Sequence, residues 1–436
     1  MALNFRLLGY GCFGFLCAVR MGAEPKYDLL LKSGHLIDPR NKISAVRDIA
    51  ILNGRVAAVD AHLPSEDALK SVDVSGLYIT PGLIDIHVHV YTGTGEPGSY
   101  AGDNSVYPDG FTFRSGVTTA VDAGGAGWRN FDDFKERIID RANTRILAFL
   151  NIVGHGMRGD RFEQDLGDMD ARATAEKAQA HKGLIVGVKT AHYAGPEWTP
   201  VEKAVEAGNL ANIPVMVDFG KNHAERPIDE LVTRKLRPGD IYTHVHSGNR
   251  NEQTASGQVN PALWLGRKRG VLFDVGHGAG SFVWRVAVPA IQEGFLPDSI
   301  STDLHIASMN AGMKDFLNVM DKFLAMGLSM EDVILRSTWN PAREIKHEEL
   351  GHLSVGAIAD LAVLRLENGK FGFVDIFGAR LDGTRKLTCE LTIHDGKVVY
   401  DLNGITRPLW NSLPAGYRET GEARWDAVSP AGLKRR

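Results

Sequence analysis

The sequence has little cysteine, no block of like charge and, beyond its start, no long apolar run. Of three cysteines only Cys389 lies outside the first 20 residues, so a chain lacking that segment would have no internal disulfide. Charged residues are scattered, with a net charge of −4, which excludes a basic surface for nucleic acid. No later segment is long and apolar enough to span a membrane. What remains is a globular protein whose 436 residues can form one large and one small domain.

The first 23 residues have the order of a secretory signal. Arg6 precedes an apolar run over residues 7–19, and the small residues Gly22 and Ala23 follow. Arg20 stands where a small residue is preferred before cleavage. We expect an exported protein that loses residues 1–23. A cytoplasmic chain with a wrongly assigned start codon is the alternative.

Two similar turns stand near opposite ends of the chain. Asn53-Gly54 separates alternating apolar runs near the start, and Asp395-Gly396 repeats this design near the end. Such pairs favour a two-residue hairpin turn. We therefore expect both chain ends to form one small β-sandwich domain. The predicted boundaries are residues 24–78 and 350–403 for this domain and residues 404–436 for a C-terminal extension.

Between these ends, eight apolar runs alternate with amphipathic segments. The runs end at His89, Asp122, His155, Lys189, Asp218, His244, Asp274 and Asp303. Successive run ends are 26 to 34 residues apart, which suits one βα unit each. Eight such units predict a parallel (β/α)8 TIM barrel over residues 79–349. An open doubly wound sheet is the alternative, but no GxGxxG motif follows the first run.

Active sites of such barrels lie at the carboxyl ends of the strands, where this sequence gathers its histidines. His87 and His89 stand two residues apart, so they share one face of a strand and can bind the same ion. Imidazole and carboxylate ligands indicate zinc or another divalent first-row metal. The side chains expected at these ends are His87, His89, His155, Lys189, Asp218, His244, His246, His277, Asp303 and His305.

The ordered motifs resemble those of a known family. They are "PGLIDIHVH", "GVKTAH", "THVH" and "STDLH", followed by "STWNPARE" and "GHLSVGAIADLAVL". Together they resemble the amidohydrolase superfamily, above all its dihydroorotase, hydantoinase and deacetylase-like branches. The resemblance covers nearly the whole chain. It implies a hydrolase with one or two divalent metal ions, zinc by preference, that cleaves an amide, N-acyl or cyclic amide bond of a small molecule.

The resemblance also implies roles for single residues. His87, His89 and Asp303 would bind one metal ion, and His244 would bind a second. Lys189 would react with carbon dioxide to give a carbamate that bridges both ions. A lysine that merely forms a salt bridge is the alternative.

The fifth run departs from the family pattern, because it ends in Asp218 rather than histidine. Asp218 can act as an oxygen ligand itself. The alternatives, in order, are a single metal ion and a ligand supplied by His223 from the following loop. For His244, the second choice is His246, two residues further along the same face.

The resemblance implies attack by metal-bound hydroxide, with Asp303 as the catalytic residue that accepts a proton and returns it to the departing amine. Arginine forks suit a substrate carboxylate, and the loops offer Arg158, Arg161, Arg250 and Arg285. The residues predicted to bind substrate are His155, His192, His277 and Arg285, and Asp274 is expected to line the pocket.

Two other functions stay open on the same residues. An ester or lactone hydrolase would use the same attack and differ only in the leaving atom. A degenerate relative acting as a binding module would have lost its ligands, whereas five of six expected positions are intact. Family members commonly form dimers or tetramers, so a homo-oligomer is also open.

Overall fold

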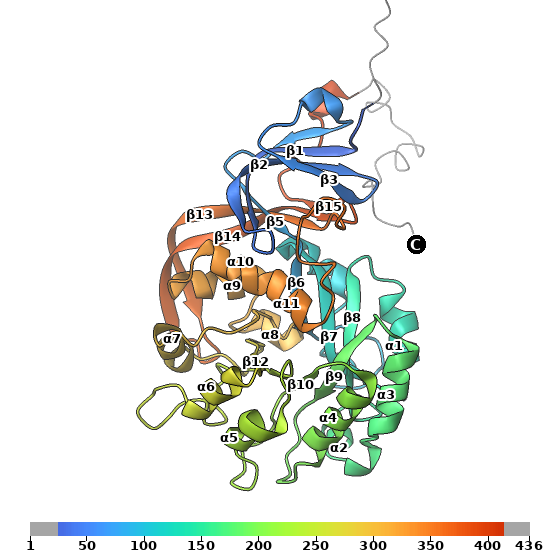
Figure 1. The fold of residues 1–436 in the computed structure, drawn as a ribbon, viewed down its shortest axis with the longest axis vertical. Coiled ribbons are helices and arrows are strands. Elements are labelled where there is room, and N and C mark those ends of the chain that lie inside the picture. Colours follow the sequence, from blue (N-terminus) through green and yellow to red (C-terminus); the bar gives the residue numbers. More distant parts are fainter. Residues whose placement is uncertain (1–24, 414–436) are drawn as a thin grey trace, which may run out of the picture.

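The computed structural model describes residues 25–413. The predicted signal segment and most of the predicted C-terminal extension lie outside these described residues. Within them the chain forms two sheets, one from both chain ends and one from the middle of the sequence (Figure 1). No helix of residues 25–413 combines the length and the apolar character needed to cross a membrane.

The strands of both chain ends form one eight-stranded sheet with the order β15-β14-β13-β5-β1-β2-β3, to which β4 is added beside β1. β5 joins the two ends, since it pairs with β1 on one side and with β13 on the other. Leu31, Ile49, Val363 and Leu391 share one buried core, so both ends contribute to a single small domain. The strands are β1 (Leu29–Asp38), β2 (Ile43–Leu52), β3 (Arg55–Asp60), β4 (Ser71–Asp73), β5 (Tyr78–Pro81), β13 (Leu361–Val374), β14 (Arg380–His394) and β15 (Lys397–Asp401).

Both predicted hairpin turns are present, and they lie back to back. Asn53 and Gly54 have φ angles of 50° and 74°, and Asp395 and Gly396 have 47° and 75°, as a type I′ turn requires. A Cβ atom on Gly396 would lie 2.6 Å from Cα of Gly54. The two ends of the chain therefore meet at glycines that leave no room for a side chain.

The middle of the chain forms the predicted TIM barrel. Seven parallel strands follow one another in sequence order: β6 (Leu83–Val88), β7 (Val117–Gly127), β8 (Arg145–Asn151), β9 (Ile185–Thr190), β10 (Val215–Val217), β11 (Ile241–Tyr242) and β12 (Leu272–Phe273). The eighth position is irregular, since single bridges join Ser299 to Asp274 and Leu304 to Val88. Asp303 between them has a φ of 50°, and a left-handed residue interrupts a regular ladder.

Helices surround the barrel, as Figure 1 shows. They are α1 (Phe131–Phe134), α2 (Asp160–Glu163), α3 (Ala171–Ala180), α4 (Thr199–Ala211), α5 (Ile228–Glu230), α6 (Pro261–Lys268), α7 (Trp284–Gln292), α8 (Ile306–Asn310), α9 (Phe316–Ala325), α10 (Met330–Ser337) and α11 (Trp339–Glu344). α9 also contacts the small domain, because Oδ1 of Asp321 accepts a hydrogen bond from Leu387 N in β14 at 2.8 Å.

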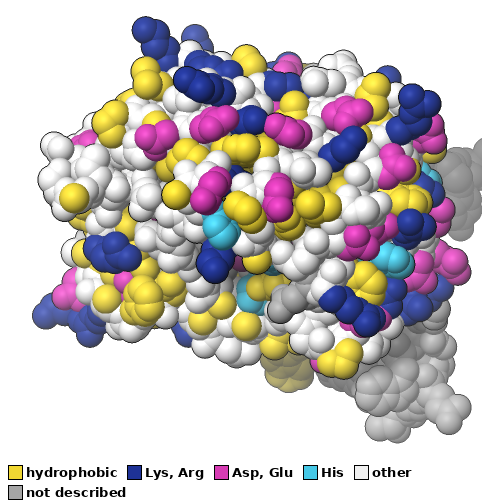
Figure 2. Space-filling model, turned by 90° about the horizontal axis from the view of Figure 1, so that it is seen from below, with side chains coloured by type: hydrophobic (Ala, Val, Ile, Leu, Met, Phe, Trp, Pro, Cys, Tyr) yellow, Lys and Arg dark blue, Asp and Glu magenta, His cyan; other side chains and the backbone are white. Residues whose placement is uncertain are grey.

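The amino ends of the barrel strands face the small domain. β6 begins two residues after β5 ends, and Arg145 at the start of β8 forms ion pairs with Asp360 and Asp395 of the small domain. The carboxyl ends therefore open on the opposite face. Figure 2 looks at that face, where histidine side chains lie between acidic ones.

Candidate metal centre

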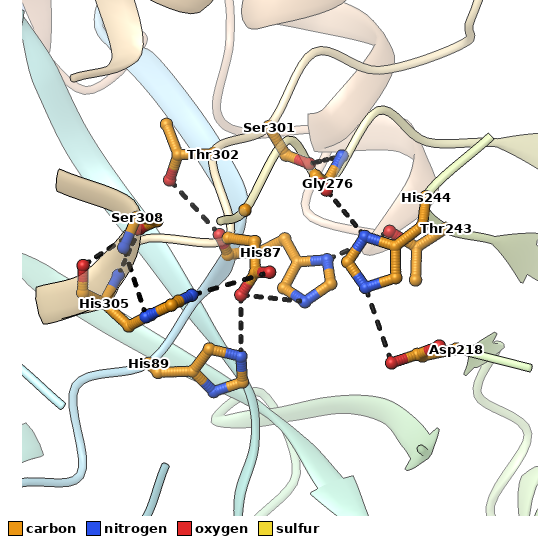
Figure 3. Close-up of polar contacts among 12 residues, drawn as sticks. His87, His89, Asp218, Thr243, His244, Gly276, Ser301, Thr302, His305 and Ser308 are labelled. Atoms are coloured by element: carbon orange, nitrogen blue, oxygen red, sulfur yellow. Dashed lines mark hydrogen bonds and ion pairs between the residues drawn. The ribbon is translucent and has the colours of Figure 1, made fainter. Parts of the chain in front are cut away.

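Three buried side chains converge at the carboxyl end of β6. The ligand atoms of His87, His89 and Asp303 all lie within 4.8 Å of one another. Oδ1 of Asp303 is 3.0 Å from Nε2 of His89 and 3.8 Å from Nε2 of His87, and Figure 3 shows both rings turned towards this point. The same oxygen is buried and accepts no hydrogen bond from the described residues. Two imidazoles and a free carboxylate oxygen fit a divalent first-row metal ion.

The buried carboxylate of Asp274, directly after β12, orients His87. The Thr243 hydroxyl donates to Oδ2 of Asp274 at 2.7 Å and lies 3.0 Å from Nδ1 of His87. Because that hydroxyl hydrogen is used, Nδ1 of His87 must carry the proton and Nε2 is left as the ligand atom. Burial opposes the charge of Asp274, but bonds from His87, Thr243 and Ser301 outweigh it and lower its pKa.

Lys189 on β9 is buried beside this group. Its Nζ lies 3.1 Å from Nε2 of His87, and no carboxylate of residues 25–413 forms an ion pair with it. Burial lowers the pKa of Lys189. A Cβ atom on Gly124 would lie 2.7 Å from Cγ of Lys189, so glycine at that place in β7 makes room for the lysine. The result is a buried lysine without an ion-pair partner among residues 25–413.

His244 and Asp218 form a second group next to Lys189. Nδ1 of His244 donates to the Gly276 carbonyl at 2.6 Å, so its Nε2 is free and lies 3.5 Å from Oδ2 of Asp218. The guanidinium of Arg250 holds Oδ1 of Asp218 at 2.6 Å, and Nε2 of His192 is 3.2 Å from Oδ2. Burial would raise the pKa of Asp218, yet Arg250 and His244 outweigh it and hold this pKa well below its usual range.

Comparison with known proteins agrees with this geometry. The chain is 35% identical over 344 residues to a deacetylase of Brucella anthropi, which covers 77% of the chain and 83% of that relative. It is 34% identical over 335 residues to a deacetylase of Agrobacterium fabrum, with 75% and 80% covered. Residues 284–399 match the pattern described as the amidohydrolase family.

The chain belongs to the amidohydrolase family. Its structure is similar to that of an adenine deaminase, with a TM-score of 0.77, 28% identity and 86% of this chain and 100% of that chain covered. A dihydroorotase follows with a TM-score of 0.72, 30% identity and coverage of 86% and 99%. The protein is therefore an amidohydrolase that acts on carbon–nitrogen bonds other than peptide bonds, in a family that generally uses divalent metal ions.

The backbone of this amidohydrolase is strained where the site side chains meet. Asp303, His244 and His192 have φ angles of 50°, 65° and 56°, which are uncommon for residues other than glycine. Such strain gathers at functional sites, where the surrounding structure holds it in place. It turns each of these side chains into the opening at the carboxyl ends of the strands.

Two alternative ligands of the sequence analysis lie elsewhere. The ring of His246 is fully buried, with centroids of Phe282 and Phe323 at 5.7 Å and 5.9 Å. β11 ends at Tyr242, so the side-chain alternation that would bring His246 beside His244 does not extend that far. Nε2 of His223 is 2.6 Å from the Ala194 carbonyl on the surface.

The residues predicted to bind substrate separate into different places. His192 lies at the opening between Asp218 and Glu163; burial opposes its charge, but these carboxylates raise the pKa of His192 well above its usual value. The ring of His155 lies beside Phe162 at 4.9 Å, outside the ligand cluster. His277 is fully buried, and its Nε2 faces Lys322 at 2.5 Å rather than the opening.

The arginines considered for a substrate carboxylate have different surroundings. Arg158 pairs with Glu96 and Arg250 with Asp218, so both guanidinium groups are already neutralised. Arg161 lies over the Phe162 ring. Arg285 is exposed in the first turn of α7, with its guanidinium against Gly248.

Two residues near the metal centre, Asp85 and Tyr100, are not among the predicted site residues. Asp85, two positions before His87 on β6, accepts hydrogen bonds from Oγ1 and N of Thr302 at 2.5 Å and 3.1 Å. The same two-residue alternation that relates His87 to His89 could have found it. Tyr100 comes from the loop after β6, and its ring lies 4.7 Å from that of His89 and 5.4 Å from that of His192. No motif marks that position.

Proposed function

We propose that this amidohydrolase hydrolyses an N-acyl bond, and first of all an N-acetyl bond, of a small molecule with two divalent metal ions, for which zinc fits. The observation that carries this proposal is the position of Lys189, which is buried between two groups of ligand atoms and forms no ion pair with the described residues. Two relatives named deacetylase align with three quarters of the chain or more, which supports acyl transfer to water over deamination.

Lys189 is suited to form a carbamate. Burial lowers the pKa of Lys189 and so favours its neutral amine, and a neutral amine adds carbon dioxide with loss of one proton. The carbamate oxygens would bring to this position the negative charge that no described carboxylate supplies by an ion pair with Lys189. His87 on one side and His244 on the other have ring centroids only 5.0 Å apart, so one carbamate can serve both groups.

Asp218 is our proposed replacement for the family histidine. Its Oδ1 is held by Arg250, while Oδ2 faces Nε2 of His244. Oδ2 also lies 3.2 Å from Nε2 of His192, but it keeps a second lone pair for a metal ion, and Arg250 fixes its direction through Oδ1. His223 has no such orientation, since it is bonded to a surface carbonyl.

Asp303 is the proposed proton carrier. When bound, the metal ions would lower the pKa of a water molecule towards 7 and polarise the substrate carbonyl. Asp303 accepts the proton of the attacking water and passes it to the amide nitrogen as the carbon–nitrogen bond breaks, so that amide and water give a carboxylic acid and an amine. Tyr100 and His192 border the opening above Asp303 and would contact the substrate.

Metal content per chain tests this proposal. Protein purified without chelators should contain two metal ions in the wild type and one or none in Lys189→Ala and Asp218→Ala. His223→Asn is the matched control and should keep two. One metal ion that is unaffected by Lys189→Ala would overturn the carbamate, and no metal ion at all would favour a binding module.

Parallel assays separate the leaving atoms and the substrate charge. We expect faster release of acetate from an N-acetyl compound than from the O-acetyl form of the same carboxylic acid. A substrate without the carboxylate should react at a similar rate, because Arg158 and Arg250 are paired within the protein. Faster cleavage of the O-acetyl compound would make the protein an esterase on the same site.

A further inference from the structure

The segment Gly276-His277-Gly278 lies directly against the proposed metal ligands. The Gly276 carbonyl accepts the hydrogen bond of His244 Nδ1. A Cβ atom on Gly276 would lie 2.8 Å from that same nitrogen and 3.0 Å from Nδ1 of His87. A Cβ atom on Gly278 would collide with Oδ2 of Asp303. The two glycines, with φ angles of 46° and 55°, let the backbone come this close, but glycine is also flexible.

His277 is the one side chain that can anchor this segment, and it points away from the metal centre. Its Nδ1 lies 2.9 Å from the Gly278 carbonyl, to which it donates, so Nε2 is an acceptor. Nζ of Lys322 donates to that Nε2 at 2.5 Å. The imidazole is stacked on Phe282 with a centroid distance of 4.6 Å and an angle of 10° between the rings.

Lys322 is a fully buried lysine in the middle of α9. Besides His277, its Nζ donates to the Gly312 carbonyl at 2.7 Å, and no carboxylate of the described residues forms an ion pair with it. A buried amine on a packed helix is costly to keep. An apolar side chain would pack in the same place without the cost of burying an amine. Packing alone therefore does not explain a lysine at this position.

The small domain forms hydrogen bonds with the segment that contains Phe282 and Trp284. The loop 375–379 joins β13 to β14, and its Ile376 N donates to the Phe282 carbonyl at 3.2 Å. Nε1 of Trp284 donates to the Ala379 carbonyl at 2.9 Å, and Trp284 begins α7. Phe282, which carries the His277 ring, is therefore held from the side opposite the metal centre.

We infer that Lys322 and His277 are positioning residues that fix the Gly276–Gly278 segment and, through it, the metal ligands His244 and Asp303. The inference rests on the proposed function, since it concerns the same metal centre. His244 is the more affected ligand, because its hydrogen bond goes to the segment itself, whereas Asp303 only packs against Gly278.

The test measures zinc affinity by chelator competition in the full chain. Lys322→Met removes both hydrogen bonds but keeps an unbranched side chain. We expect zinc binding to weaken about 10- to 100-fold at the site that contains His244, as for other residues that orient a ligand. Lys314→Met, an exposed lysine in the loop before α9, is the matched control and should bind zinc like the wild type. The thermal midpoint of each variant shows whether it is folded.

A second pair of variants guards against a simple folding defect. His277→Gln offers an oxygen acceptor to Lys322 and should keep zinc affinity within a few-fold of wild type, whereas His277→Leu should match Lys322→Met. Equal zinc affinity in wild type and Lys322→Met, or equal losses in Gln and Leu at position 277, would overturn the positioning role alone. A wild type that binds no zinc would overturn the proposed function together with this inference.

Discussion

Asp303 shows at the scale of one residue how backbone strain serves the site. Its left-handed φ of 50° turns the carboxylate towards His87 and His89 and ends the barrel ladder at the same time. Asparagine tolerates this conformation far better than most residues, because its short side chain can hydrogen-bond locally. The substitution Asp303→Asn therefore separates the chemistry of the carboxylate from the shape of the chain.

Asp303→Asn should keep its metal ions but lose turnover. The amide oxygen can still act as a ligand, whereas the amide accepts no proton from the attacking water, so we expect kcat to fall by at least about 10²-fold. Metal analysis and acetate release on the same preparation check this. Normal turnover at normal metal content would remove Asp303 from proton transfer.

How far single site residues follow from sequence depends on the length of the strand that carries them. β6 has six residues and ends at Val88, so the alternation still holds one residue further on and brings His87 and His89 to one point. β11 and β12 have two residues each, so His246 and His277 lie beyond any regular strand. Their rings turn into the core beside Phe282, and no periodicity in the sequence reveals that turn.

At the scale of elements, short motifs account for the tight turns and for the caps at Asn260 and Ser329, but not for the start of α4. Both hairpin turns form, and Asn260 caps α6 by accepting a hydrogen bond from Ala262 N at 2.9 Å. Thr199-Pro200-Val201-Glu202 has the pattern of a capping box, but Thr199 is already the first residue of α4. Trp198 occupies the cap position with helical φ and ψ angles. A capping box at Thr199 would begin the helix at Pro200, one residue later than α4 begins.

Gly396→Ala should destabilise the small domain without changing catalysis. The left-handed turn costs alanine roughly 1–2 kcal/mol, and the new Cβ would press on Cα of Gly54. Gly76→Ala is the matched control, since Gly76 has a similar φ of 78° with no atom within 4 Å of the new Cβ. A thermal midpoint lower for Gly396→Ala than for Gly76→Ala would show the contact between the turns. Equal midpoints would reduce the effect to backbone strain.

At the scale of the whole molecule, the two sheets have different roles. The small domain holds the amino ends of the barrel through Arg145, and the metal centre opens at the other end. The sequence predicted this division from hairpins near both chain ends and from evenly spaced strand ends. It could not predict that β14 would also pack along α9, because that contact joins residues far apart in the chain and depends on the length of the β13–β14 hairpin.

The contact between α9 and β14 makes stability depend on pH through Asp321. Burial raises the pKa of Asp321 to about 8, so the folded chain keeps this carboxyl protonated where the unfolded chain ionises it. A raised folded pKa gives stability that is complete below the unfolded pKa and is lost as the pH rises towards the folded pKa. Asp321→Asn keeps the acceptor for Leu387 N and removes the titration. The free energy of unfolding of Asp321→Asn, relative to that of the wild type, should therefore increase with pH by up to about 1.4 kcal/mol per pH unit between about pH 4 and 8.

Urea unfolding at pH 5 and pH 8 measures this gain. Asp382→Asn is the control, because Asp382 lies on β14 with its side chain 75% exposed, and its difference from wild type should stay constant. Asp321 lies on a barrel helix and Leu387 on the small domain. If the relative stability increases with pH only in Asp321→Asn, this contact between the two domains lowers the stability of the wild type at high pH. A difference that does not change with pH would show that the Asp321 carboxyl is already ionised in the folded protein, and that this junction contributes packing without any dependence on protons.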